Sequence, residues 1–314
     1  MTDVTTTRLN RPGSLWRRIW NCRVLYLLIL PLIVWYVMFC YMPMAGLYLA
    51  FERFSYKGGI WGSAWVGLNN FREFLTDGEF LRSLRNTVIF SLGKLALQFP
   101  MAIMLALAIN ELQHARIKKI YQTVFTFPHF ISWVVMAGIL KNMFASNGVI
   151  NQLLTVWGME SVSPLLSLTG FRPFIWFSNI WKEAGWDTII YMAALAGIDP
   201  GLYEAAEIDG ANRWRKIWHI TLPGIRSTIL IMLILEIGRI MTTGASFDQV
   251  FNLYSSPVYE VADTIDTYIY RTSFGGTKNF GYTTAVGLSK SVIGVLMMLG
   301  ANRLVTACGE DGLF

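Results

Sequence analysis

Six long apolar segments dominate this chain and decide which solvent it folds in. A helix of roughly 20 residues crosses a hydrocarbon core of about 30 Å, and each of these segments is long enough to do so. They are residues 24–48, 86–110, 123–144, 172–196, 223–244 and 281–305. Hydrophobic residues make up 54% of the 314 residues and charged residues only 15%, too little polar surface to cover a water-soluble globule of this size. The sequence therefore predicts an all-α integral membrane protein with six transmembrane helices in one domain, residues 24–305.

Positively charged residues gather in the connections that an even number of spans puts on one side. These connections are a basic tail at residues 1–23, the loop 111–121 and the loop 197–222, and the tail 306–314 lies on the same side. The positive-inside rule places this side in the cytoplasm, so we expect both termini to be cytoplasmic. The opposite side also carries positive charge, in the segment 52–85, at Arg53, Lys57, Arg72, Arg82 and Arg85.

The external connections are expected to cap the bundle. Residues 54–81 place four apolar side chains near helical spacing among charges, which predicts a short amphipathic helix in the membrane interface. These side chains are Phe71, Phe74, Leu75 and Phe80. The connection 246–279 repeats the pattern with Val261, Ile265 and Ile269 on one side.

One polar stretch, EAAEIDGANRWRKIWHITLP at 204–223, stands out between the apolar runs. Asp199 and Pro200 form a helix-starting pair, and Gly210 suits a left-handed stop, so a helix is predicted over about 200–209. Glu204 is expected near the first turn, where the helix dipole favours a carboxylate.

Ala205 and Ala206 give this helix a face without bulk, which would let another protein approach closely. From the residues alone, an amphipathic helix lying on the membrane surface fits the stretch as well as a helix that docks a partner.

The spacing of this stretch resembles the cytoplasmic signature of permease subunits of binding-protein-dependent ABC importers. The residues that carry the resemblance are Glu204, Ala205, Ala206, Gly210, Ile220, Leu222 and Pro223. Further stretches are similar to the LplB-like group of sugar permeases, which are relatives of the maltose-type membrane subunits. Among them are YMPMAGLYLAF at 41–51, WVGLNNFREF at 65–74 and WKEAGWDTIIYMAALAGIDPGLYEAA at 181–206.

This resemblance implies a type I ABC importer permease fold in a bacterial inner membrane, with residues 200–209 as the coupling helix. It implies as partners a second, homologous permease, two ATP-binding subunits and an extracytoplasmic solute-binding protein. The cargo would be an oligosaccharide, since the group includes importers of acidic oligosaccharides, alginate fragments among them.

Several other functions lack their sequence signature. No GxxxxGK[ST] phosphate loop is present, so we expect ATP and magnesium to be bound by partner subunits rather than by this chain. His114, His129 and His219 are scattered and the three cysteines show no metal-ligand spacing, so neither an enzyme nor a metal or cofactor site is expected. Positive charges lie mainly at the ends of apolar runs, which argues against nucleic acid as a partner. A self-contained secondary transporter is the less favoured alternative, because it would not need a docking helix.

Ionisable residues within the apolar segments are costly, by roughly 2.5–3.5 kcal/mol each on insertion scales, and are expected to face a cavity or one another. They are Lys94, Lys182, Glu183, Glu236, Arg239 and Lys290. Glu236 and Arg239, three residues apart, are expected to pair within one helix. Four positive residues against two negative ones leave two lysines without partners, and Lys182 and Lys290 are the expected pair facing the cavity.

Together with Trp186, which could stack on a sugar ring, these ionisable residues form the expected substrate path. An acidic, uronate-type cargo would neutralise two unpaired lysines. A neutral oligosaccharide stays open as the alternative, with the carboxylates of the second permease as partners for the lysines.

Overall fold

The computed structural model describes Trp20, residues 22–241, 246–275 and 279–307, Gly309 and Gly312. The expected basic tail 1–23 and tail 306–314 therefore lie mostly outside the described residues, as does the end of the expected segment 223–244. The described chain is built from helices, with one two-stranded sheet, so the all-α class is confirmed.

Three helices are long and apolar enough to cross a membrane within the described ranges. The first is α2 (Arg23–Tyr36), which runs on through a π-helical turn, η1 (Val37–Tyr41), and a 3-10 segment, η2 (Met42–Phe51). The second is α4 (Gly78–Asn110), which begins at Gly78 rather than at residue 86, and the third is α16 (Phe280–Ala307). Each coincides with an expected span.

Two further segments reach this length only as bent pairs, which would raise the number of spans to 5. In the first, α5 (Ala115–Thr126) and the 3-10 turn η3 (Phe127–Phe130) meet α6 (Trp133–Met143) at 96°. In the second, α10 (Arg213–Lys216), η4 (Ile217–Thr221) and α11 (Leu222–Gly224) meet α12 (Arg226–Arg239) at 62°.

The expected uninterrupted apolar segment at 123–144 is thus a broken one. Pro128 lies in η3, and the side chain of Ser132 accepts a hydrogen bond from the Val135 N–H and starts α6 as a new helix. A proline without an N–H followed by a capping serine explains why the helix stops and restarts there.

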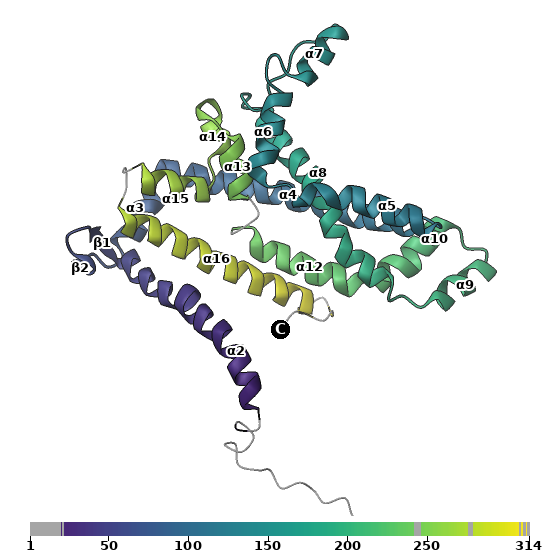
Figure 1. Ribbon diagram of the computed structural model, residues 1–314, viewed down its shortest axis with the longest axis horizontal. Coiled ribbons are helices and arrows are strands. Elements are labelled where there is room, and N and C mark those ends of the chain that lie inside the picture. The colour runs from purple at the N-terminus through teal and green to yellow at the C-terminus, as the bar shows by residue number, and fades with distance from the viewer. Residues whose placement is uncertain are drawn as a thin grey trace, which may run out of the picture.

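The remaining expected span is α8 (Phe171–Leu195), whose 25 residues are long enough to cross a bilayer. Its middle carries Lys182, Glu183 and Asp187, so it is less apolar than the other spans. α8 packs along α4, and α5 and η3 pack against α8 (Figure 1). α12 packs along α16, which also contacts η2. α2 itself leaves the bundle and buries none of its residues within this chain (Figure 1).

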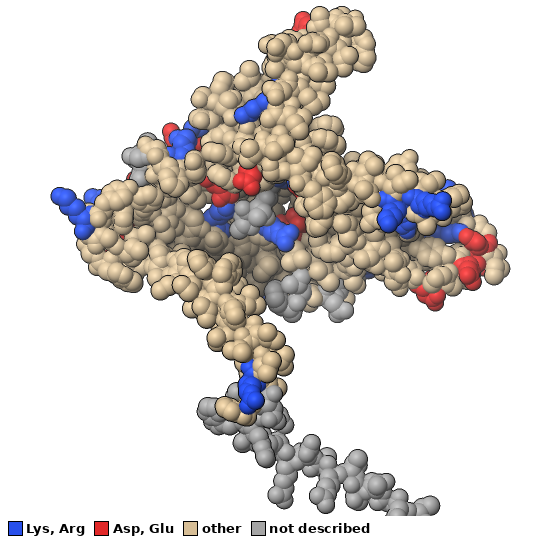
Figure 2. All heavy atoms as spheres, viewed as in Figure 1, with Lys and Arg blue, Asp and Glu red and all other residues tan. Residues whose placement is uncertain are grey.

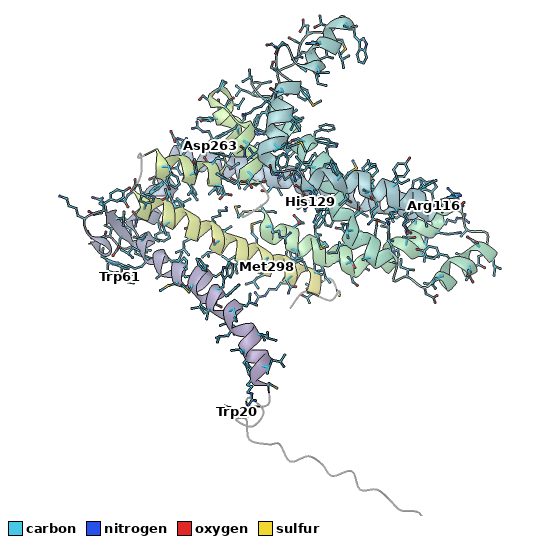
Figure 3. The ribbon with its side chains drawn as sticks, viewed as in Figure 1. Trp20, Trp61, Arg116, His129, Asp263 and Met298 are labelled. Atoms are coloured by element: carbon cyan, nitrogen blue, oxygen red, sulfur yellow. The ribbon has the colours of Figure 1, made fainter. Side chains whose placement is uncertain are left out.

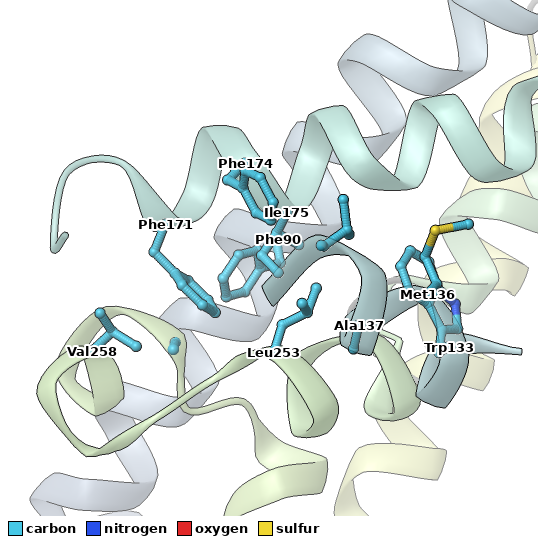
Figure 4. Close-up of a cluster of buried hydrophobic side chains, with 11 residues drawn as sticks. Phe90, Trp133, Met136, Ala137, Phe171, Phe174, Ile175, Leu253 and Val258 are labelled. Atoms are coloured by element: carbon cyan, nitrogen blue, oxygen red, sulfur yellow. The ribbon is translucent and has the colours of Figure 1, made fainter. Parts of the chain in front are cut away.

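A cluster of buried apolar side chains joins α4, α6 and α8 to the external connection (Figure 4). Phe90 and Phe171 are fully buried with ring centroids 6.3 Å apart, and both lie in the cluster with Leu253 and Val258. Leu253 ends α13 (Phe247–Leu253), and Val258 ends the turn η5 (Ser256–Val258). The external connection is thereby fixed to the spans through its apolar side chains.

Two more short helices, α14 (Tyr259–Ala262) and α15 (Ile265–Phe274), complete that connection. An ion pair holds it together, because the Arg271 guanidinium lies 2.8 Å from the Asp263 carboxylate and 3.1 Å from that of Glu79. Burial alone would lower the pKa of Arg271, but these two carboxylates outweigh it and raise that pKa. Arg271 therefore stays charged and joins α15 to the start of α4.

The first external connection differs from the sequence-based expectation. β1 (Glu52–Ser55) and β2 (Gly59–Trp65) pair antiparallel, with Glu52 opposite Trp65, and the helix α3 (Asn69–Thr76) follows. Phe74 of α3 and Phe80 of α4 are only 4% and 6% exposed and pack with Tyr268 and Tyr282, while Leu75 is 61% exposed, so α3 is an amphipathic helix with one side packed on the bundle. The expected short helix is thus present, whereas the two strands before it were not expected.

The end of the external helix α3 is tied to the bundle by one carboxylate. Asp77 caps α4 by accepting from the Glu79 and Phe80 N–H groups, and it also accepts from the Tyr268 and Tyr282 hydroxyls at 3.0 and 3.1 Å. Burial opposes ionisation of Asp77, but these hydrogen bonds prevail and place its pKa below the usual value.

The helix α7 (Val149–Val156) follows α6 and projects away from the bundle with it, as an external arm (Figure 1). Buried Asn151 fixes its position, because the Asn151 amide donates to the Ala145 and Val162 carbonyls and accepts from the Val162 N–H. The arm is therefore held by its own polar contacts.

α5 and α8 approach each other closely at Gly185. A Cβ at Gly185 would lie 2.0 Å from the Phe125 carbonyl oxygen, which is main chain and cannot move aside alone. We expect Gly185→Ala to force α5 from α8 and to lower the free energy of unfolding by about 1–3 kcal/mol. Thermal unfolding in detergent measures this. Gly138→Ala in α6 is the control, since nothing lies within 4 Å of its Cβ position, and an equal loss in both variants would contradict the packing argument.

Candidate functional site: an exposed helix and a polar chamber

The predicted polar stretch forms α9 (Pro200–Ile208), a helix with well-defined ends. The Asp199 side chain accepts from the Gly201 N–H at 2.9 Å, as its expected capping role requires. Gly210 has φ +72°, a left-handed conformation that disfavours a residue with a side chain. Glu204 lies in the middle of α9, and no acidic residue occupies the first turn, so the expected position of Glu204 near the first turn is wrong.

Most of the surface of α9 is uncovered within this chain. Glu204 and Ala205 are exposed, Ala206 is half-buried, and Ile208 is 88% exposed. A short helix presenting an isoleucine and two alanines to solvent is suited to pack against another protein.

Two contacts attach α9 to the segment that follows it. The Lys216 ammonium lies 2.6 Å from the Glu207 carboxylate, and this hydrogen bond lowers the pKa of that carboxyl. The hydroxyls of Tyr203 and Thr221 are 3.0 Å apart. Lys216 and Thr221 belong to the segment that leads into α12, so these contacts join α9 to that segment.

Three further residues of the expected coupling stretch form this bend. Ile220 and Leu222 are half-buried in η4 and α11, while Pro223 is exposed. The fully buried Ile225 follows at the break and joins Ala102, Ala106 and Tyr191 in a core between α4, α8 and α12. The bend therefore packs against α4 and α8, which also line the polar chamber described next.

A polar chamber of about 200 Å³ lies between α4, α8 and α12. It is lined by one ammonium, three carboxylates, two side-chain amides and several aromatic side chains. The lining includes Lys94, Gln98, Phe99, Trp133, Asn179, Glu183, Asp187, Tyr191 and Glu236. Figure 2 shows basic and acidic side chains together in the hollow at the centre of the molecule.

The carboxylates of the chamber each have a partner. Glu183 contacts His129 at 2.6 Å and Lys182 at 2.8 Å, and the expected pair of Glu236 with Arg239 is confirmed at 3.4 Å. Asp187 accepts from the Gln98 amide, which in turn accepts from Asn179.

Lys182 does not have the expected position in the cavity. It is 4% exposed, and its ammonium donates to the His129 carbonyl and to Glu183, both at 2.8 Å, while facing the Trp133 ring at 5.3 Å. His129 lies in η3, next to the break before α6, and a main-chain carbonyl that a broken helix leaves free in the membrane needs a donor. Lys182 is therefore a structural clamp on the broken span (Figure 3 labels His129).

Lys290 is likewise paired, since its ammonium forms an ion pair with Asp266 of α15. The expectation of two unpaired lysines is thus wrong. The sequence count omitted Asp187 and could not foresee Asp266. With Asp187 included, Lys94, Lys182 and Arg239 balance Glu183, Asp187 and Glu236.

Lys94 is the chamber cation with unused hydrogen-bonding capacity. It lines the chamber near three carboxylates, but it donates no hydrogen bond to any residue in the described ranges. An ammonium has three donors, so Lys94 can bind a ligand oxygen.

Trp186 is not among the residues that line the chamber. It is 42% exposed, and its ring stacks on His129 at 4.2 Å with an interplanar angle of 7°. The sequence analysis missed the aromatic residues that do line the chamber, because no local signal distinguished them from packing residues; they are Phe99, Trp133 and Tyr191. Asp187 could have been found, because it lies one turn after Glu183 on the same helix face.

The family model for binding-protein-dependent transport system inner membrane components matches residues 98–307. The chain belongs to this family. The match runs from the second half of α4 to α16 and includes α9 and the chamber residues from Gln98 onward, so the expected permease resemblance is confirmed.

Two curated relatives are similar over nearly the whole chain. The polygalacturonan/rhamnogalacturonan transport system permease protein YteP of Bacillus subtilis (strain 168) is 42% identical, over 93% of this chain and 90% of the relative. Protein LplB of the same organism is 43% identical, over 92% and 91%.

A solved structure confirms the type I ABC permease fold. A chain from the crystal structure of a bacterial ABC transporter involved in the import of the acidic polysaccharide alginate matches with TM-score 0.85 and 39% identity, over 94% of this chain and 99% of that chain. A second structure, of the bacterial alginate ABC transporter in complex with alginate pentasaccharide-bound periplasmic protein, matches with TM-score 0.86 and 38% identity, over 96% and 100%.

Proposed function

We propose that this chain is a membrane-spanning subunit of an ABC importer that carries an oligosaccharide into the cytoplasm. The observation that carries the proposal is the exposed helix α9, joined through a bend to helices that enclose a polar chamber. Family membership and the permease relatives support it. The chain acts as a transport subunit rather than as an enzyme.

The proposed assembly contains a second, homologous permease, two ATP-binding subunits and an external solute-binding protein. A solute-binding partner is supported by the matched transporter that was crystallised with a periplasmic protein. The subunit lies in the inner membrane with both termini and α9 in the cytoplasm, on the side where basic loops gather.

The proposed mechanism is alternating access driven by ATP. Closure of the ATP-binding subunits draws the two coupling helices together, and the contacts of Glu207 and Tyr203 pass this movement to η4, α11 and α12. Because Glu236 of α12 lines the chamber with residues of α4 and α8, the movement changes the opening of the chamber. Without a coupled ATPase this chain has no energy source of its own.

Two substitutions on α9 test the coupling role. We expect Glu204→Lys and Gly210→Val to weaken docking of the ATP-binding subunits by about tenfold or more, a loss of at least about 1.4 kcal/mol at an interface centre. Charge reversal changes the docking face, and a β-branched residue cannot easily adopt the φ of Gly210. Subunit retention on purification and transport-coupled ATPase activity are the measurements.

The controls use the same changes in the external arm. Gly158→Val alters a glycine with the same φ of +72°, and Glu160→Lys reverses an exposed carboxylate. These variants should retain docking and transport. Normal docking and coupled hydrolysis in both α9 variants would refute the coupling role.

We further propose that the cargo is an acidic, uronate-type oligosaccharide. One relative is named for polygalacturonan and rhamnogalacturonan transport, and the matched structures for alginate. Lys94 is the residue that would bind a sugar carboxylate, while Trp133 and the amides of Gln98 and Asn179 are suited to ring faces and hydroxyls. A neutral oligosaccharide is the second candidate, because the charges around the chamber balance without a ligand.

Uptake by the assembled transporter separates the two cargoes. For Lys94→Gln we expect uptake of a uronic oligomer to fall by about tenfold or more, since a hydrogen bond to a charged group is worth about 1.5–3 kcal/mol. Uptake of the carboxyl-reduced, neutral oligomer should change little. Lys182→Met is the control, because loss of the clamp should lower uptake of both oligomers equally.

If Lys94→Gln takes up each oligomer as fast as the unaltered transporter does, the neutral cargo is favoured. Equal loss of both would make Lys94 a structural residue like Lys182.

A further inference from the structure

The surface of α5 carries a furrow that the transport mechanism does not use. Five side chains at helical spacing line an open groove of about 460 Å³; they are Arg116, Lys119, Ile120, Thr123 and Val124. Ile120 and Val124 are 61% and 59% exposed, so the floor is apolar and faces outward from the bundle.

The N-terminal end of this furrow is positively charged. Arg116 and Lys119 are exposed, and their side chains make no hydrogen bond or ion pair with any residue that the structure describes. Side chains in a helix lean toward its N-terminus, so both cations reach beyond the apolar floor. Figure 3 labels Arg116 at this end of α5, and Figure 2 shows basic side chains gathered there.

The helix terminus adds to this positive field. The residue before α5, His114, makes no side-chain cap, and the first turn contains no acidic residue. The neighbouring Lys118 is occupied, because it donates to Asn110 at 3.0 Å. Glu111 is the nearest carboxylate in the loop 111–121, so Arg116, Lys118 and Lys119 outnumber it.

The position of the furrow relative to the membrane surface decides which molecules can occupy it. α5 starts at the end of the bundle where α9 and α10 lie, and it runs inward along α8 (Figure 1). In the proposed orientation, with α9 in the cytoplasm, an anion bound at Arg116 and Lys119 would lie at the cytoplasmic membrane surface, and the apolar floor would lie at the level of the acyl chains. A phospholipid carries its phosphate and its acyl chains in this arrangement.

We propose that this furrow binds an anionic phospholipid of the inner leaflet, with its phosphate at Arg116 and Lys119 and an acyl chain along Ile120 and Val124. Charge complementarity selects anionic over zwitterionic lipid, at a strength that scales with the number of basic residues near the surface. The site lies apart from the chamber, so lipid binding does not rest on the identity of the cargo.

Native mass spectrometry of the assembled transporter tests the site, with phosphatidylglycerol and phosphatidylcholine of matched chains as probes. We expect phosphatidylglycerol to bind more tightly. Arg116→Gln should weaken its binding by about five-fold, and Arg116→Gln with Lys119→Gln by about 30-fold, following about 1 kcal/mol for each basic residue. Val124→Trp should also weaken binding, because the indole fills the furrow without changing charge.

Matched controls separate this site from general charge effects. Arg53→Gln with Lys57→Gln removes two exposed cations from the external hairpin and should leave phosphatidylglycerol binding unchanged. Equal binding of the two lipids, or an equal loss in this control, would overturn the proposal. An effect of the charge variants without any effect of Val124→Trp would also overturn it and leave only a phosphate site.

Discussion

The absence of water from the hydrocarbon core is the constraint on which this structure depends. Each charge and each free main-chain group at that depth needs a partner within the protein or a wet cavity. The break between α5 and α6 creates such a free carbonyl at His129, and Lys182 of α8 supplies its donor. Glu183 then neutralises Lys182 and binds the His129 ring, so one pair of adjacent residues on α8 fixes the broken span in two ways.

The chamber is a consequence of the same arrangement. With Lys182 occupied by the break, Glu183 turns to the space shared by α4 and α12, where Lys94, Asp187 and Glu236 also lie. The carboxylates of this space have partners within the chain, whereas the Lys94 ammonium donates no hydrogen bond to any described residue. The bend before α12 connects one wall of the chamber to the segment that contacts α9, since Lys216 and Thr221 precede α11 and α12 in the chain.

Local signals in the sequence were enough to predict α9 but not the chamber. The cap at Asp199 and the left-handed Gly210 act within a few residues, so their pattern alone predicts the helix and its end. The partners of Lys182 and Lys290 depend on packing between elements, since His129 lies 53 residues before Lys182 and Asp266 lies on a different helix from Lys290. Five of the apolar segments and α8 could be located from composition, but the 96° break within one of them could not.

Accessibility of α9 from each side of the membrane, with and without ATP-binding subunits, tests the central claim most directly. A cysteine at Ile208, which is 88% exposed in this chain, is treated with a membrane-impermeant thiol reagent in vesicles of either orientation, after replacement of the chain's own cysteines. The account predicts labelling only from the cytoplasmic side, and only after the ATP-binding subunits are removed. Labelling from the external side, or equal labelling in the presence of those subunits, would contradict it.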